Sequence, residues 1–288
     1  MKCSLKARLS SHIFLMQSND SFFLFCDGKY GIMEPHKERN GEGDEPMAYR
    51  RILAVGDIHG NYRKFLTLWR QLAFDGARDL AVFLGDYTDR GPESREVMAW
   101  VIEHFGRPGF VFLRGNHDEM MLAACLGIER NLWLQNGGRT TVESLRALEK
   151  SEADAFLAHW AKTIRDMKLS YEVVQDGQAY WFMHAGIEPG VPLAEQEEET
   201  LLWTRDFAMA DTYDGTPVVT VGHTPVPYLS IDGSVIPPIA AHPLILDDGR
   251  RILADTGGFL PKGRISAVDV LTKRYWRSKL LPEERGLA

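Results

Sequence analysis

The stretch GDYTDRG, residues 85–91, follows directly on the apolar run LAVFL, residues 80–84. The apolar run predicts a buried strand, and the stretch after it places two carboxylates and a guanidinium in a glycine-bracketed loop. Aspartate and glycine alone would be enough to make a turn. An arginine beside Asp86 and Asp89 indicates, in addition, a site for a cation, an anion or both.

The same arrangement, an apolar run followed by a glycine-containing polar loop, recurs along the chain. RILAV (51–55) ends at GDIHG, and FVFL (110–113) ends at RGNHD. Helical spacing of apolar residues follows each predicted strand, at residues 61–74, 93–105 and 117–127. Alternating strands and helices predict an α/β fold with a largely parallel sheet, covering helices, and functional loops at the carboxyl ends of the strands.

The second half of the chain has a different pattern. Residues 140–167 are helical in spacing and polar on one side, which predicts two helices over the site. Residues 171–186 and 244–258 then predict hairpins with Asp-Gly turns. Residues 218–225, VVTVGHTP, predict another buried strand that ends in a loop.

Five predicted strand ends carry oxygen or imidazole ligand atoms, a mixture that suits Mn, Fe or Zn rather than a thiolate site. A lone histidine is more often a hydrogen-bonded structural residue, and we assign that role to His104, His159 and His242. The recurrence over five glycine-flanked loops is what predicts a metal site. The candidate residues are Asp57, His59, Asp86, Asn116, His117, His184 and His223.

Taken in order, GDIHG, GDYTDRG, RGNHDE, HAG and GHTP resemble the motifs of the phosphoprotein phosphatase family of metallophosphoesterases. The likeness is greatest to the bacterial and bacteriophage members, the lambda phosphatase branch, and it spans about residues 51–258. It implies a calcineurin-like αββα sandwich with a dinuclear metal site at the carboxyl ends of the strands. Two divalent ions are therefore expected, Mn first, with Fe or Zn as alternatives.

The resemblance also implies a role for each motif residue. Asp57 and His59 would hold the first ion, Asp86 would bridge both, and Asn116, His184 and His223 would complete the second site. The phosphate-binding and proton-transfer positions fall on Asp89, Arg90 and His117, and Arg205 in LLWTRD matches a further phosphate-binding arginine.

The expected activity is that of a serine/threonine protein phosphatase, in which a metal-bridging hydroxide attacks phosphorus in line. Arginine suits the phosphate because its fork donates to two oxygens at once. The leaving alkoxide of serine or threonine is strongly basic and needs a proton. His117 can supply that proton, and Asp89 would orient the imidazole and keep it protonated.

Two other functions stay open. Bacterial bis(5'-nucleosyl)-tetraphosphatases, the diadenosine tetraphosphate hydrolases, resemble the chain in the first three motifs. The pattern expected for them lacks the aspartate at position 89 and the GHT sequence, and their weakly basic leaving group needs an oriented acid less. GHTP rather than GHTH also separates the chain from calcineurin-like phosphodiesterases. A non-catalytic phosphoprotein-binding pseudoenzyme is least favoured, because every ligand and acid position is filled.

Two further segments have alternative interpretations. WLQNGG, residues 133–138, resembles a segment of the bacterial and phage members. It either lines the substrate cleft or forms a tryptophan-anchored helix end with a glycine cap. Asp255 in ADTGG is either an outer partner of a metal-bound histidine or, as we favour, a turn residue.

Composition narrows the class of protein. The net charge of −7 argues against a nucleic-acid partner, and no apolar run approaches the length of a membrane span. The three cysteines have no metal-ligand spacing and suit a reducing cytoplasm. Residues 1–46 are expected to form a disordered extension, since QSNDS interrupts the apolar patches that a signal peptide would need to be continuous. Residues 47–288 are expected to form the catalytic domain.

Overall fold

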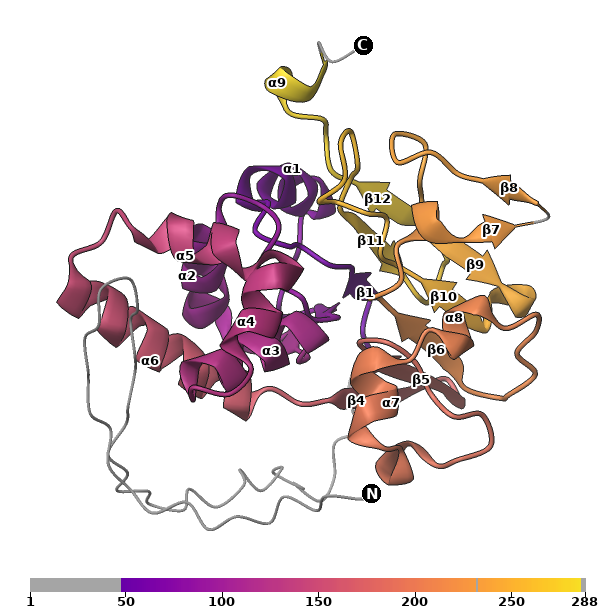
Figure 1. Ribbon diagram of the computed structural model, residues 1–288. Helices are drawn as coiled ribbons and strands as arrows, with labels where there is room; N and C mark the ends of the chain where they lie inside the picture. Colours follow the sequence, from indigo (N-terminus) through magenta and orange to yellow (C-terminus); the bar gives the residue numbers. More distant parts are fainter. Residues whose placement is uncertain (1–47, 232, 286–288) are drawn as a thin grey trace.

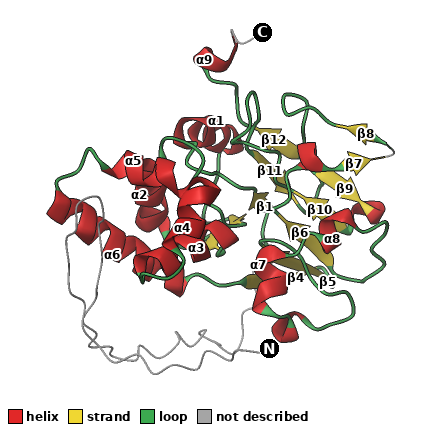
Figure 2. Cartoon of the chain, viewed as in Figure 1, coloured by secondary structure: helices red, strands yellow, loops and turns green. Residues whose placement is uncertain are grey.

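The computed structural model describes residues 48–231 and 233–285, so the predicted extension, residues 1–46, lies outside the described residues. Helices α1 to α6 gather on one side of the strands in Figure 1, whereas α7 and α8 overlap other strands in this view. Residues of α7 and α8 share a hydrophobic cluster with Met183, Val219 and Leu253. Figure 2 shows the same separation of helices and strands. None of the helices in the described ranges is both long and apolar enough to cross a membrane.

The first sheet has five strands, of which three neighbouring ones are parallel. Helices α1 (Tyr62–Leu72) and α2 (Ser94–His104) connect these three strands, and α3 (Asn116–Cys125) follows the last of them, as the sequence predicts. In spatial order the strands are β12 (Tyr275–Arg277), β11 (Ser266–Asp269), β1 (Arg51–Val55), β2 (Asp79–Phe83) and β3 (Phe110–Phe112).

The second sheet also has five strands with a parallel centre, and its edges are the antiparallel partners in the two predicted hairpins. In spatial order the strands are β4 (Ser170–Gln175), β5 (Gln178–Met183), β6 (Val218–Val221), β10 (Arg251–Leu253) and β9 (Leu244–Leu246). A separate two-stranded ribbon pairs β7 (Ser230–Ile231) with β8 (Ser234–Val235).

The predicted parallel strands are present in both sheets, and the two sheets are those of the expected αββα sandwich. The first sheet has one antiparallel edge, at β12, whereas both edges of the second sheet are antiparallel. The turns between β4 and β5, between β9 and β10 and between β11 and β12 are too short for a crossover connection, so only antiparallel pairing is open to these strands.

The predicted pair of helices in residues 140–167 is confirmed as α5 (Arg139–Leu145) and α6 (Lys150–Asp166). Only α5 reaches the candidate site, whereas α6 packs against α2 and α3. The remaining α-helices of the described ranges are α4 (Arg130–Trp133), α7 (Glu198–Trp203), α8 (Asp206–Met209) and α9 (Pro282–Arg285). Other helical turns are a π-helical one at Leu134–Gly138 and 3₁₀ turns at Leu193–Glu195, Val226–Tyr228 and Asp247–Gly249.

Strand β1 shows how the layers are built. Its run RILAV is apolar on both faces because both faces are covered. Ile52 and Ala54 belong to the core that the two sheets enclose, together with Phe182 of the second sheet. Leu53 and Val55 pack instead with residues of the outer helices. The layers are therefore helix, sheet, sheet, helix, which confirms the αββα sandwich.

Candidate metal centre

The carboxyl ends of the parallel strands from both sheets meet at one place. The first sheet supplies Asp57 and His59 after β1, Asp86 after β2 and Asn116 at the start of α3. The second sheet supplies His184 after β5 and His223 after β6. All six predicted ligands are buried. The structure therefore brings together every metal ligand that the sequence predicts.

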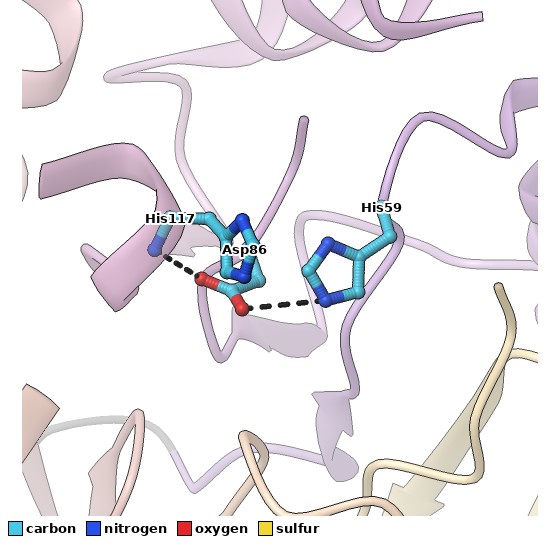
Figure 3. Close-up of side chains that lie close together, drawn as sticks. All are labelled: His59, Asp86 and His117. Atoms are coloured by element: carbon cyan, nitrogen blue, oxygen red, sulfur yellow. Dashed lines mark hydrogen bonds and ion pairs between the residues drawn. The ribbon is translucent and has the colours of Figure 1, made fainter. Parts of the chain in front are cut away.

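The carboxylate of Asp86 lies at the centre of this group. Its Oδ2 atom is 3.4 Å from His59 Nε2, and its Oδ1 atom is 3.4 Å from His184 Nε2. Oδ1 also accepts a hydrogen bond of 2.9 Å from the backbone N–H of His117 (Figure 3). Because its two oxygens face two different imidazoles, the carboxylate has the geometry of a bridge between two ions.

The other ligand atoms gather around Asp86, and Asp57 lies within reach of both His59 and His184. Asp57 Oδ2 is 3.9 Å from His59 Nε2. Asn116 Oδ1 is 2.9 Å from His184 Nε2 and 3.1 Å from His223 Nδ1. This cluster of ligand atoms is compatible with a dinuclear site.

Backbone carbonyls orient two of the histidine ligands. His59 Nδ1 donates to Thr88 O at 3.0 Å, and His184 Nδ1 donates to Leu84 O at 2.8 Å. A carbonyl can only accept, so the hydrogen is on Nδ1 and the Nε2 lone pair faces the site. This is the usual way in which a protein fixes a metal-binding imidazole.

The charges of the site fit divalent cations. Burial lowers the pKa of His59 and His184, and it lowers that of His223 to about 3, so all three imidazoles are in the neutral, ligating form. Burial raises the pKa of Asp57 well above its usual range, and the nearby charges of Asp255 and Asp86 add to the effect. Crowded buried carboxylates beside neutral imidazoles form a donor set whose negative charge metal ions would balance.

Asp86 differs from Asp57 in its pKa. Burial alone would raise the pKa of Asp86, but the neighbouring histidines and Arg90 outweigh burial and hold it below the usual range. Asp86 is therefore ionised and ready to bind cations.

His117 lies in the same cluster, and its ligand atom is within 4.8 Å of those of His59 and Asp86. Both of its ring nitrogens have other partners. Nδ1 donates to Asp89 Oδ2 at 2.8 Å, and Nε2 is 2.8 Å from Arg90 Nη2. What distinguishes His117 from His59 and His184 is its Nδ1 partner, which is a buried carboxylate rather than a backbone carbonyl. That pairing is consistent with the proton-transfer position assigned to His117.

Asp89 is fixed from behind by two residues that the sequence analysis did not assign to it. Trp133 Nε1 donates to both carboxylate oxygens at 3.0 Å, and Thr141 Oγ1 donates to Oδ1 at 2.7 Å. Trp133 is the first residue of WLQNGG, so this segment supports the site from the interior. The indole N–H of a tryptophan usually finds a hydrogen-bond partner when the ring is buried, and this is the only sequence signal that could have suggested the contact.

Two arginines reach the site from opposite sheets. Arg90 Nη1 is 2.6 Å from His59 Nε2. Arg205 Nη1 donates to Thr224 Oγ1 at 3.2 Å and to His223 O at 3.3 Å. The backbone N–H of Arg90 donates to Gly137 O at 3.2 Å. The guanidinium groups therefore lie beside the metal ligands, where an anion bound to the ions would meet them.

A further buried carboxylate, Asp118, organises the loops and was not predicted. It accepts hydrogen bonds of 2.9 Å from the backbone N–H groups of Asp86 and Gly115. The two loops approach closely at Gly85, where φ is +100° and a Cβ atom would lie 2.5 Å from Gly115 N. Asp118 is the third residue of α3, the position from which an acidic side chain completes a capping box at the start of a helix. This position was the sequence signal that could have indicated its role.

The structure also bears on Asp255 and on the three histidines that were assigned a structural role. Asp255 Oδ1 accepts the backbone N–H of Gly257 at 2.9 Å, which supports the turn interpretation, and no hydrogen bond joins it to a histidine within the described residues. His104 and His242 bind backbone carbonyls, and His159 is an exposed residue of α6. His104 and His242 therefore have the hydrogen-bonded structural role assigned to them, whereas His159 is a surface residue.

Left-handed backbone conformations are frequent among the site residues. Such a conformation costs energy in residues other than glycine, and it tends to occur at functional sites. Five of the ten predicted site residues have φ between 45° and 72°: His59, Asp86, Asp89, Arg90 and His223.

Residues 50–259 match the calcineurin-like phosphoesterase family. The chain belongs to this family. It is 34% identical over 160 residues to serine/threonine-protein phosphatase 2 of Escherichia coli, covering 55% of this chain and 69% of that protein. It is 30% identical over 194 residues to the asymmetrical bis(5'-nucleosyl)-tetraphosphatase of Geobacillus thermodenitrificans, covering 60% of this chain and 78% of that protein.

A solved structure agrees with the fold. The crystal structure of a putative diadenosine tetraphosphatase superposes with a TM-score of 0.54 at 19% identity, over 81% of this chain and 95% of that chain. Calcineurin-like phosphoesterases use a dinuclear divalent metal site, and the clustered residues fit that use. The relatives carry both substrate names, so likeness alone does not separate the two activities.

Proposed function

We propose that this calcineurin-like phosphoesterase is a serine/threonine protein phosphatase, a phosphomonoesterase that acts on phosphorylated proteins or peptides. The observation that carries the proposal is the hydrogen bond between His117 Nδ1 and Asp89 Oδ2, 2.8 Å long and buried. A proton donor oriented in this way matters most for a strongly basic leaving group such as a serine alkoxide.

Two divalent ions are part of the proposal, with Mn²⁺ first and Fe or Zn compatible with the same oxygen and nitrogen ligands. When bound, such ions lower the pKa of a water molecule and offset negative charge on a phosphate. Asp57, His59 and Asp86 would hold one ion, and Asp86, Asn116, His184 and His223 would hold the other.

The remaining residues bind the substrate and move a proton. Arg90 and Arg205 would donate to phosphate oxygens, since a guanidinium fork matches their spacing. His117 Nε2 would deliver a proton to the leaving oxygen. Asp89, held by Trp133 and Thr141, would keep Nδ1 protonated and the ring correctly oriented.

The surface beside the site supports a peptide rather than a polyphosphate substrate. An open pocket of about 400 Å³ lies between α3 and α7 and is lined by Glu119, Glu198, Glu199, Leu202 and Trp203. The helix on one side, α3, begins at the predicted ligand Asn116, and the predicted phosphate-binding residue Arg205 comes soon after α7, the helix on the other side. Arg114 Nη1 is 2.9 Å from Glu119 and 3.9 Å from Glu198, so one positive charge faces the three carboxylates. The remaining negative charge would oppose a tetraphosphate chain and would accommodate basic residues beside a phosphoserine.

Hydrolysis of a dinucleoside tetraphosphate is the second candidate, and the names of the tetraphosphatase relatives favour it. The same metal and arginine residues would serve that reaction. It differs in its leaving group, a weakly basic phosphate, for which the pair of His117 and Asp89 would contribute little.

One comparison separates the two candidates. The Mn²⁺-loaded protein is assayed for kcat/KM with a phosphoserine peptide that has flanking lysines and with diadenosine tetraphosphate. We expect a preference of at least ~10-fold for the peptide, because a single leaving-group acid contributes ~10²–10⁴-fold where it is needed. A preference of that size for diadenosine tetraphosphate would refute the protein phosphatase proposal and leave the family membership intact.

A further inference from the structure

Phe259 contacts two groups of the site and belongs to none of the family motifs described above. It lies in the turn after β10, and its ring centroid is 4.3 Å from Arg90 Cζ. The same ring meets the His59 imidazole edge to face, with centroids 5.1 Å apart and an interplanar angle of 85°. One aromatic side chain therefore touches both a predicted phosphate-binding arginine and a predicted metal ligand.

The Arg90 guanidinium is held from several directions. Its Nη1 is 2.6 Å from His59 Nε2, and its Nη2 is 2.8 Å from His117 Nε2, so both imidazoles lie at its donor edge. The Phe259 ring covers one face of the guanidinium plane. Gly137 has φ of +111°, and a Cβ atom there would lie 2.8 Å from Arg90 Cγ, so the aliphatic stem is also confined.

The turn that carries Phe259 is itself anchored in the interior. Lys64 of α1 is buried, and its Nζ donates to Gly258 O at 2.8 Å and to Gly263 O at 3.1 Å. The same Nζ is 2.6 Å from Glu284 in α9. The single buried ammonium group of Lys64 thus binds one carbonyl before Phe259 and one after it. These two hydrogen bonds fix the backbone from which the ring projects.

We infer that Phe259 is a positioning residue for Arg90. The inference rests on the proposed role of Arg90 in binding phosphate. A cation over an aromatic face is attracted by the ring, and the ring also excludes water from that face. With one face covered, the guanidinium plane is fixed and its donor edge stays directed at the metal centre. The interaction would therefore strengthen phosphate binding by reducing the freedom that Arg90 loses when it binds.

The test measures phosphate affinity in the metal-loaded full-length protein. Inorganic phosphate serves as a competitive inhibitor of p-nitrophenyl phosphate hydrolysis, and Phe259→Leu is compared with the parent and with Phe259→Tyr. A cation–π contact is worth ~0.5–2 kcal/mol, which converts to an increase of ~2- to 30-fold in the inhibition constant for Phe259→Leu. KM should rise with it while kcat changes less, because phosphate is bound in both the ground and transition states. Phe259→Tyr keeps the ring face and should restore the parent values.

Controls separate this role from general stability. Phe105→Leu makes the same change at a half-buried ring that packs on Phe112, and it should leave phosphate inhibition unchanged. In an Arg90→Ala background, Phe259→Leu should have no further effect on phosphate inhibition. Metal content should match the parent, because the Thr88 carbonyl still orients His59.

The inference is overturned if Phe259→Leu leaves the inhibition constant unchanged. It is also overturned if the increase is equally large without Arg90, or if Phe259→Tyr fails to restore the parent values. Preference for diadenosine tetraphosphate would instead count against the proposed function, and this experiment does not depend on that preference.

Discussion

Strand β2 has a buried aspartate near each end, and the two are held in opposite ways. Asp79, its first residue, has Oδ2 2.6 Å from Arg50 Nη2 and 2.5 Å from Arg51 Nη2. Burial alone would raise its pKa, but the hydrogen bonds from the two arginines hold the pKa well below the usual range. Its negative charge is balanced within the protein.

Asp86, beyond the other end of β2, has no such dedicated partners. It shares its surroundings with Asp57, whose pKa is raised, and with histidines that burial keeps neutral. Arg90 is nearby but binds the imidazoles. A carboxylate balanced by arginines stabilises the fold, whereas crowded carboxylates without enough cations form a site that external cations complete.

Of the changes that test this contrast, removal of metal should have the largest effect on activity. Exhaustive chelation should abolish hydrolysis of p-nitrophenyl phosphate, and Mn²⁺ should restore it, because the nucleophile depends on the ions. Turnover is measured alongside metal content by elemental analysis. Undiminished activity in protein shown to be free of metal would contradict the function assigned to the Asp86 end.

His117→Asn should have the next largest effect. Asparagine retains hydrogen-bonding groups but cannot deliver a proton, so turnover of a phosphoserine peptide should fall ~10²–10⁴-fold. The loss with p-nitrophenyl phosphate should be clearly smaller, since p-nitrophenolate is a stable leaving group. Metal content should stay near that of the parent.

His184→Asn is the matched control, because it removes a predicted ligand in the same cluster. It should lower metal occupancy and slow both esters alike. An equal loss of both esters in His117→Asn, or an emptied metal site, would show that His117 is not the leaving-group acid.

The metal ligands at the Asp86 end of β2 could be predicted from the sequence. The predicted metal ligands are close in sequence to strand ends, and parallel strands bring their carboxyl ends together, so local motifs were enough to find Asp57, Asp86 and His223. Family resemblance supplied the division of roles.

Supporting contacts could not be found in this way, because they join segments that are distant in sequence. Thr141 binds Asp89 across 52 positions, and Lys64 binds Gly258 across 194. The antiparallel strands β11 and β12 were also missed. Both runs are short, and they become strands by pairing in turn beside β1, a contact with a distant part of the chain.

Asp79→Asn should lower the free energy of unfolding by about 2 kcal/mol, because it leaves two arginines without their anion and one of them, Arg50, is partly exposed. Since the pKa of Asp79 is lower in the folded state, its stabilisation is present at pH values above ~4 and is lost as pH falls through the folded pKa. Denaturant unfolding at pH 7 and below pH 4 tests both points. A difference from the parent that does not shrink in acid would show that the ion pairs are not its source.

Asp57→Asn should have the smallest effect, and of the opposite sign. In metal-free protein it removes one of the crowded carboxylates, and its amide oxygen can still accept from His223 N, so the free energy of unfolding should rise slightly. Added Mn²⁺ should then stabilise this variant much less than it stabilises the parent. Thermal unfolding with and without Mn²⁺ measures both effects. If Asp57→Asn destabilises the metal-free protein as Asp79→Asn does, then Asp57 has a balancing partner of its own, and the contrast between the two ends of β2 does not hold.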